Sequence, residues 1–467
     1  MKSNLNLPAT LSSSLPSNGI NNNDYLKNKI ISITKFQRPY IKNTLDELAE
    51  KDPGNTNTLC DYIIAEQNEI NIKESTKEWT TKNLLSLLKF VDSKNFKEIA
   101  KQDILDFLNN KRKPESIDPT HKSIGTWNNL QILFLKFFRW LYNREEPDPK
   151  RRGTPDCMKG VRRLPRKEKS CYKPSDLWTV EEHTIFLKYC PSKRDRAFHA
   201  MANDTSARPH ELLNLKIKDI KFKITSDGIQ YAELLVSGKT KPRTLPLFSS
   251  IPYIKDWLLN HPTAENPDSW IFISQSNNQS NNTGKKLTRD ALLKHYKEQY
   301  RNGYFTKLLK DETVPVNDKS YIKNMLTKPW NLYVLRHSAL TQKSKILKEH
   351  ILRDHAGWSA SSKMPQTYIH YFGTESSNSL LEAYGVIKPE DNDQTNKLLK
   401  PKYCPNCNES NKHEAKLCIS CKMVLSYDSY NQTVENENQM KDALAQLSDQ
   451  VLILNERIQK LEKDKSR

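Results

Sequence analysis

The chain has 467 residues, enough for about two or three domains with separate cores. Lysine and arginine outnumber aspartate and glutamate by 74 to 55, and the net charge of +19 favours a polyanionic partner such as nucleic acid over a basic surface kept only for solubility. The longest apolar stretch, residues 131–142, is interrupted by Lys136 and Arg139, so we expect neither a transmembrane helix nor a signal peptide, and a cytoplasmic protein.

The first part of the chain is expected to be disordered and then helical. Serine and asparagine are frequent up to residue 23 and large apolar residues are few, which predicts a disordered N-terminal segment over residues 1–35. Apolar residues recur at helical spacing from about Asp24 to Arg144, and a helical domain is predicted over residues 36–149. One amphipathic helix is especially clear, with an apolar face formed by Leu130, Phe134, Phe137, Phe138 and Leu141.

A basic linker is predicted over residues 150–173, which combine two prolines with ten lysines and arginines. Such a segment can be a solvated connection between domains. It can also be a strap across DNA phosphates, in which each contact adds salt-sensitive affinity. We favour the strap because the positive charge is so concentrated.

A second domain is predicted over residues 174–390. Thr179 followed by Glu182 three residues later is typical of a capped helix start. Three short runs have strand character and are separated by turn residues, namely residues 221–225, 229–236 and 244–248. Helical patterns follow them. The sequence therefore predicts a mixed domain, mainly α with one small antiparallel β-sheet.

Four short motifs in this domain carry the chemistry. They read Ser-Ala-Arg-Pro-His-Glu-Leu (206–212), Ser-Gly-Lys-Thr-Lys-Pro-Arg (237–243), Tyr-Val-Leu-Arg-His-Ser (333–338), and Gly-Trp-Ser followed by Gln-Thr-Tyr-Ile-His (357–370). Guanidinium groups bind two phosphate oxygens in a fixed plane, and a lysine can protonate a leaving oxygen. A tyrosine can form a covalent intermediate that preserves the bond energy. Together the motifs indicate attack on a DNA phosphodiester by a tyrosine.

At these motifs the chain resembles the tyrosine recombinases, or phage-type integrases, and especially their archaeal branch. The resemblance implies that Arg208 and Arg336 clamp the scissile phosphate. It implies that the nucleophile is Tyr368, with Tyr371 as the alternative. It also implies that residues 36–149 form a core-binding domain, which grips DNA together with the catalytic domain.

The hairpin lysine of the family falls on Lys239, with Lys241 as the alternative, and would act as the general acid. Two positions depart from the usual family pattern. Tyr333 stands where a histidine is usual; a phenol with a pKa of about 10 is a poor base, so Tyr333 is expected to donate a hydrogen bond or to be only a packed helix residue. Trp358 stands where many members have histidine, and its indole N–H can only donate.

Beyond a linker over residues 391–402, the tail contains a metal-binding pattern. Two Cys-x-x-Cys pairs separated by ten residues contain Cys404, Cys407, Cys418 and Cys421. Four thiolates at this spacing suit one tetrahedral zinc ion, which predicts a zinc ribbon over residues 403–424. A redox pair is the alternative, but it would not need two such motifs.

The last segment, residues 436–467, is predicted to be a coiled coil. Apolar residues alternate spacings of four and three, at Met440, Leu444, Leu447, Val451, Leu454, Ile458 and Leu461. β-Branched residues at the a position with leucine at the d position favour a parallel dimer. Only three heptads are present, so an amphipathic helix packed on its own domain is the alternative.

The sequence as a whole predicts a site-specific DNA recombinase that acts through a 3′-phosphotyrosine, for integration or excision of a mobile element. The expected partners are double-stranded DNA and further copies of the chain, forming a tetramer on DNA. The expected cofactor is one structural Zn²⁺, with none for catalysis. The alternatives are a relaxing enzyme similar to type IB topoisomerases and a DNA-binding protein that kept the fold without the activity.

Overall fold

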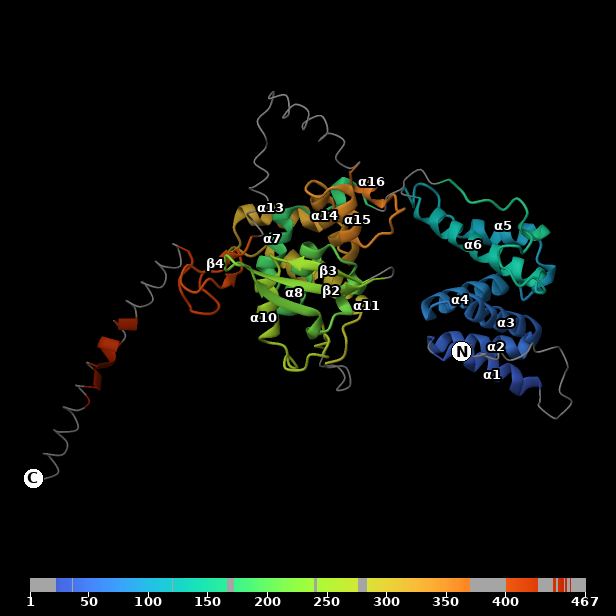
Figure 1. The fold of residues 1–467 in the computed structure, drawn as a ribbon, viewed down its shortest axis with the longest axis horizontal. Helices are drawn as coiled ribbons and strands as arrows, with labels where there is room; N and C mark the ends of the chain where they lie inside the picture. Colours follow the sequence, from blue (N-terminus) through green and yellow to red (C-terminus); the bar gives the residue numbers. More distant parts are fainter. Residues whose placement is uncertain are drawn as a thin grey trace, which may run out of the picture. The chain divides into compact units, whose positions relative to one another are not determined.

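Figure 1 shows the fold, a computed structural model that describes residues 22–35, 37–119, 121–165, 172–238, 242–275, 284–369, 400–426, 440–441, 444–448, 450–451 and 454. The chain divides into two units, Met1–Cys171 and Tyr172–Arg467. Each unit has its own hydrophobic core. Among the described helices, none combines the length and apolar character needed to cross a membrane.

The regular secondary structure in the described residues of the first unit is helical. Its helices are α1 (Asn22–Thr34), α2 (Pro39–Lys51), α3 (Pro53–Ile70), α4 (Glu74–Phe90), α5 (Lys101–Asn110) and α6 (Lys122–Tyr142), with 3-10 turns at Phe96–Glu98 and Asp156–Met158. Helix α1 shows that the prediction of disorder over residues 1–35 was wrong from residue 22 onward. Its Leu26, Ile30 and Ile33 recur at helical spacing and are buried against α2 and α3.

The predicted apolar face of α6 is confirmed as the centre of this unit's core. All five of its predicted residues are buried. The ring of Phe137 lies 5.1 Å from that of Tyr62 in α3 and 4.6 Å from that of Phe96, both in edge-on geometry. Such aromatic pairs add about 0.5–1.5 kcal/mol each beyond the area they bury. The core thus joins α6 to elements 40 or more residues earlier.

The segment predicted as a free basic linker begins as part of the first unit. Arg152 is buried and forms a two-pronged ion pair with Glu69, with N–O distances of 2.7 and 3.0 Å. Gln131 and Asn128 of α6 hydrogen-bond the backbone of Val161 and Leu164. The predicted linker boundary at residue 150 was therefore wrong, and Arg152 is committed to a carboxylate instead of phosphate.

The second unit combines helices with a three-stranded sheet. Its helices are α7 (Val180–Tyr189), α8 (Lys193–Thr205), α9 (Pro209–Leu213), α10 (Ile251–Leu258), α11 (Arg289–Lys294), α12 (Thr306–Leu308), α13 (Val316–Thr327), α14 (Leu332–Ser344), α15 (Glu349–Ala356) and α16 (Met364–Ile369). A π-helical segment, His295–Phe305, connects α11 to α12, and 3-10 turns lie at Pro174–Asp176 and Ile217–Asp219. Its strands are β1 (Ile220–Ile224), β2 (Gln230–Ser237) and β3 (Pro242–Leu247), then a small pair, β4 (Lys402–Tyr403) and β5 (Ser410–Asn411).

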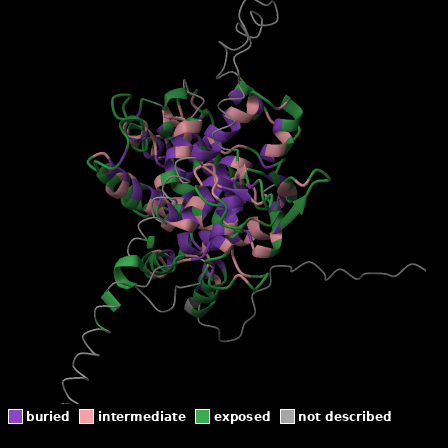
Figure 2. Cartoon of the chain, turned by 90° about the vertical axis from the view of Figure 1, so that its left-hand side faces the viewer, coloured by how far each residue is buried: buried purple, intermediate pink, exposed green. Residues whose placement is uncertain are grey.

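The predicted antiparallel sheet is confirmed, with order β1-β2-β3 and strand ends within two residues of those expected. Ala232, Leu234 and Val236 alternate along β2 and are buried, so one face of the sheet covers the core. Figure 2 shows buried residues gathered in the interior and exposed residues on the outer turns. The predicted cap of α7 is also confirmed: the Thr179 hydroxyl accepts from the Glu182 N–H at 3.3 Å, and the Glu182 carboxylate accepts from the Thr179 N–H at 2.8 Å.

Candidate active site and metal centre

Arg208 is fixed at the start of α9. Pro209 is the first helical residue, where its fixed φ suits a helix start. Glu211 closes a capping box, because its Oε2 accepts from the Arg208 N–H at 2.9 Å. Its Oε1 accepts from Arg208 Nη1 at 2.9 Å. The Arg208 side chain remains 20% exposed, so part of its guanidinium group is accessible to a ligand.

Arg243 on β3 shares the same carboxylate. Its Nη2 and Nη1 donate to Glu211 Oε2 and Oε1 at 2.9 and 3.3 Å. Burial alone would raise the pKa of Glu211, but hydrogen bonds from Arg243 and Arg208 lower that pKa to about 2. Glu211 is therefore ionised and holds two arginines from different elements. Arg243 ends the second sequence motif, residues 237–243, but no role was predicted for it.

Arg208, Arg243 and Arg336, which we call the arginine cluster, also converge on the C-terminal end of α15. Three consecutive carbonyls each accept from a different arginine: His355 O from Arg243 Nε at 3.0 Å, Ala356 O from Arg336 Nη2 at 2.8 Å, and Gly357 O from Arg208 Nη2 at 3.4 Å. The last carbonyls of a helix have no partner within the helix and lie at the negative end of its dipole. The end of α15 is thus a fitting acceptor for three cations.

Gly357, in the Gly-Trp-Ser motif, makes this approach possible. Its φ of +66° lies in the left-handed region, where it ends α15. A Cβ at this position would lie 2.7 Å from Arg243 Nη1 and 2.8 Å from its Cζ. Both the backbone conformation and the packing of Arg243 therefore require glycine.

Arg336 is the most deeply placed member of the cluster. It lies on α14, is 4% exposed, and also donates from Nη1 to Ser206 O at 2.6 Å. Burial, followed by the positive charge of Arg208, lowers the pKa of Arg336 to about 10, so the side chain stays charged at neutral pH. Its guanidinium carbon lies 5.8 Å from the ring of Trp358. Two predicted site residues are therefore in contact.

Tyr368, the predicted nucleophile, lies beside them on α16 and is buried. Its ring is nearly parallel to that of Trp358, with 5.4 Å between centroids. Its phenol oxygen lies 2.9 Å from Nδ1 of His337 on α14. The structure thus gathers Arg208, Arg336, Trp358 and Tyr368 from three separate motifs.

The remaining predicted residues differ in their placement. Tyr333 is 37% exposed on α14, and within the described part of the chain its phenol makes no hydrogen bond. Lys239 and its alternative Lys241 lie outside the described residues, as does Tyr371. His337 was missed by the sequence analysis, although its place next to Arg336 in the third motif was the available signal.

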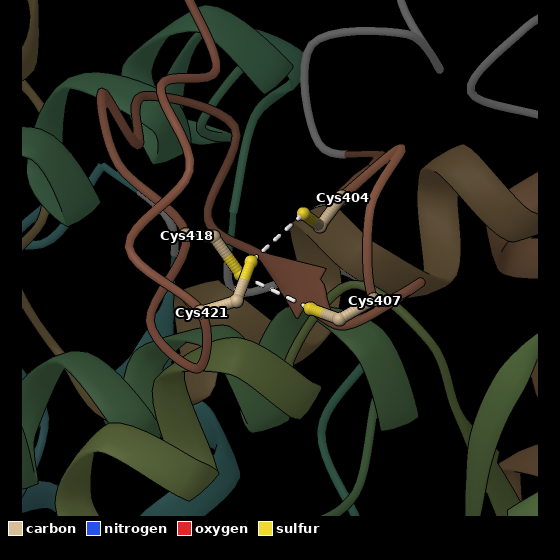
Figure 3. Close-up of side chains that lie close together, drawn as sticks. All are labelled: Cys404, Cys407, Cys418 and Cys421. Carbon is tan, nitrogen blue, oxygen red and sulfur yellow. Dashed lines mark hydrogen bonds between the residues drawn. The ribbon is translucent and has the colours of Figure 1, made fainter.

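The four predicted cysteines come together in a small module, residues 400–426, which we call the cysteine module (Figure 3). Their sulfur atoms all lie within 4.8 Å of one another. Two of the sulfur contacts, of 3.4 and 3.6 Å, join Cys404 to Cys421 and Cys407 to Cys418. Each contact joins different Cys-x-x-Cys motifs, as expected for four ligands around one ion and not for a redox pair within one motif.

The two motifs have the same backbone geometry. The N–H of Cys404 donates to Glu409 O at 2.9 Å, and that of Cys418 to Met423 O at 2.7 Å. The residue after each second cysteine, Asn408 or Lys422, has a positive φ. This repetition turns all four side chains inward, and four soft sulfur donors could hold a zinc ion.

The cysteine module contacts α10 and the β1–β2 turn of its unit. Lys255 Nζ lies 2.6 Å from Glu409 Oε1, and the Tyr253 phenol donates to Glu414 Oε2 at 3.0 Å. Further contacts join Lys412 to Asp256 and the Asn408 amide to Gly228 O. The module is therefore attached to its unit by charged and polar side chains.

Comparison with known proteins places this site in a family context. Residues 179–374, which span the whole arginine cluster and Tyr368, match the model of the phage integrase family. No curated protein sequence matches the chain.

Solved structures similar to the chain include site-specific recombinases bound to DNA. The XerH recombinase in a post-cleavage complex with difH is 18% identical, with a TM-score of 0.47 over 77% of this chain and 94% of that one. A lambda integrase dimer on a COC′ core site is 14% identical, with a TM-score of 0.44 over 68% and 95%. The Tn1549 transposon integrase with transposon right-end DNA is 15% identical, with a TM-score of 0.44 over 70% and 98%.

Proposed function

We propose that this chain is a site-specific DNA recombinase of the integrase type, which cleaves and rejoins DNA through a 3′-phosphotyrosine intermediate. The observation that carries the proposal is the buried Tyr368 phenol next to Trp358 and Arg336, within a segment that matches the phage integrase family. Arginines that are already oriented suit a phosphate that gains charge in the transition state.

In this proposal each site residue has one task. Arg208 and Arg336 bind the non-bridging phosphate oxygens, since guanidinium groups stay charged and contact two oxygens at once. Trp358 donates its indole N–H to the same phosphate. The Tyr368 oxygen bonds to phosphorus while the bond from phosphorus to the 5′-oxygen breaks, and Lys239 gives the leaving oxygen its proton. Tyr333, exposed beside this site, would donate a hydrogen bond to the DNA.

The proposed partners follow from charge and from the tail. Double-stranded DNA suits the net charge of +19, and strand exchange between two sites needs four protomers. In the described part of the tail, Leu447, Val451 and Leu454 are half or more exposed, which supports a pairing helix from a second copy. We propose one structural zinc ion in the cysteine module, integration or excision of a mobile element as the role, and the archaeal branch as the affiliation.

Covalent trapping tests the reaction. The full chain would be incubated with a library of nicked duplexes of random sequence, denatured, and separated from free DNA. Sequencing of the attached DNA identifies the preferred site, and mass spectrometry locates the nucleotide on the protein. We expect an adduct on Tyr368 and a free 5′-hydroxyl on the released strand, because the tyrosine replaces the 5′-oxygen at phosphorus.

The variant Tyr368→Phe should lose covalent attachment and keep DNA binding, since only the attacking oxygen is removed. Tyr321→Phe, in α13 of the same unit and partly buried, is the matched control and should behave as the parent chain. An adduct on Tyr371 would show that the nucleophile is misassigned. DNA binding without any adduct would support a non-catalytic protein, and plasmid relaxation without partner exchange would support a topoisomerase-like enzyme.

A further inference from the structure

His337 lies within hydrogen-bonding distance of the proposed nucleophile. Its Nδ1 lies 2.9 Å from the phenol oxygen of Tyr368. The ring is held on two sides, by Tyr172 at 4.7 Å and by Tyr368 at 5.6 Å between centroids. Tyr333, at the position where the resembled family usually has histidine, has no such contact within the described residues.

We propose that His337 is a catalytic residue that takes the phenolic proton of Tyr368 during cleavage and returns it during rejoining. This inference rests on the proposed function and adds a proton acceptor to it. As the Tyr368 oxygen bonds to phosphorus, its proton moves to Nδ1 of His337, while the 5′-oxygen takes a separate proton from Lys239. In the reverse step the 5′-hydroxyl gives its proton to Lys239 and attacks phosphorus, the bond from phosphorus to the Tyr368 oxygen breaks, and the imidazolium gives its proton back to that oxygen.

The protonation state of His337 fits this role. Burial and the neighbouring charge of Arg336 lower the pKa of His337 to about 4, so the imidazole is neutral at physiological pH. A neutral imidazole carries one proton, and if that proton is on Nε2, Nδ1 is an acceptor. The phenol then donates to Nδ1, which is the direction needed for proton transfer.

The groups around His337 should also make its pKa depend on whether DNA is bound. The cation next to it is Arg336 on α14, and the titratable groups facing it are Tyr172, before α7, and Tyr368 on α16. Burial is the larger cause of the low pKa of His337, and the charge of Arg336 is the smaller one. A phosphate paired with Arg336 would offset the smaller cause, so the pKa of His337 should rise and the acceptor become a stronger base when DNA is bound.

Cleavage kinetics over pH 4–10 test the inference on the full chain with a trapped substrate. The parent rate should rise with pH through one titration between about 4 and 6.5 and then level off. His337→Gln should cleave roughly a hundred- to ten-thousandfold more slowly at neutral pH, as expected for loss of a general base. Its rate should keep rising toward the phenol pKa of about 10. His350→Gln, an exposed histidine on α15, is the matched control and should keep the parent profile.

The outcomes separate this inference from the proposed function. If the parent forms a Tyr368 adduct but His337→Gln keeps the parent rate and pH profile, His337 is not the proton acceptor. The same conclusion follows if Tyr333→Phe, and not His337→Gln, loses the titration. If the parent forms no adduct on Tyr368, the proposed function itself fails.

Nitrogen-15 NMR of the DNA-free chain gives a readout that needs no activity. We expect His337 to be the neutral tautomer with the proton on Nε2, and its Nδ1 shift to change in Tyr368→Phe because the donated hydrogen bond is lost. A proton on Nδ1 would overturn the inference, since Nδ1 would then donate to the phenol. This measurement remains decisive even if His337→Gln folds poorly.

Discussion

The arginine cluster brings three positive groups close together, and the cysteine module does the same with four thiols that can become negative. The two sites differ in the groups that balance these charges. Three guanidinium groups are held by one ionised carboxylate and four backbone carbonyls, all supplied by the chain. Four sulfur atoms lie within 4.8 Å of one another, and the groups that donate to them are neutral: the Asn411 amide lies 3.6 Å from Cys418, and the Asn406 side chain and backbone N–H groups also reach the sulfurs.

This difference indicates whether each site needs a bound ligand to keep its geometry. The arginine cluster has its counter-charge built in, so its geometry should exist before any phosphate binds, as preorganised catalysis requires. The cysteine module has no cation of its own among its sulfurs. Four thiolates at this separation repel one another unless a metal ion neutralises them. The arginine cluster should therefore keep its geometry without phosphate, whereas the cysteine module should not keep its own without a metal ion.

The largest expected effect comes from removing the ion. Structural zinc sites contribute on the order of 10 kcal/mol or more in small domains, so chelation or Cys404→Ser should unfold the cysteine module. Native mass spectrometry should find one zinc per chain, lost in the variant, and hydrogen exchange should rise over residues 400–426. Ser420→Ala, an exposed residue between two of the cysteines, should keep the metal. A metal-free parent chain with a fully protected module would break the comparison.

A smaller effect is expected when the internal counter-charge is removed. Glu211→Gln leaves Arg208 and Arg243 without their carboxylate, and loss of one partner of a buried ion pair costs about 3–5 kcal/mol. Urea unfolding should show this loss. Combining it with Arg243→Gln should recover part of the stability, because a buried charge is removed. Exposed Glu312→Gln is the control, and equal stability of both single variants would mean that Glu211 does not hold the cluster.

The smallest expected effect concerns the approach of Arg243 to α15. Gly357→Ala combines a strained φ with a Cβ 2.7 Å from Arg243 Nη1, and should cost about 1–3 kcal/mol. Gly284→Ala is a close control, because its φ is +79° but nothing lies within 4 Å of the added Cβ. Comparing the loss of thermal stability in the two variants separates the cost of the positive φ from the cost of the collision with Arg243. Similar losses in both variants would show that the Arg243 side chain moves away at no cost.

The features that were predicted correctly are decided by residues that lie close together in the sequence. The cap of α7 and the three strands each follow from residues within a few positions, and both predictions are confirmed. The convergence of four cysteines followed from their spacing alone. These predictions succeeded because the interactions that decide them are local.

The features that the sequence did not reveal depend on distant partners. Arg152 pairs with Glu69 across 83 positions, and Arg243 reaches His355 across 112, so neither contact is visible in a local pattern. The hydrogen bond from Tyr368 to His337 spans 31 positions. The helical pattern begins at about Asp24 in the sequence, but the domain boundary was set at residue 36, so the core residues Leu26, Ile30 and Ile33 of α1 fell outside the predicted helical domain.

The shared end of α15 has a mechanical consequence for the site. Three guanidinium groups hydrogen-bond consecutive carbonyls of one helix end, so they are coupled to a single rigid element. A shift of α15 along its axis would carry all three groups in the same direction and alter the spacing between them little. Unwinding of its last turn would instead release them independently. The positional accuracy of the whole cluster therefore depends on one helical turn, and the residues that stabilise that turn affect phosphate contacts which they never touch.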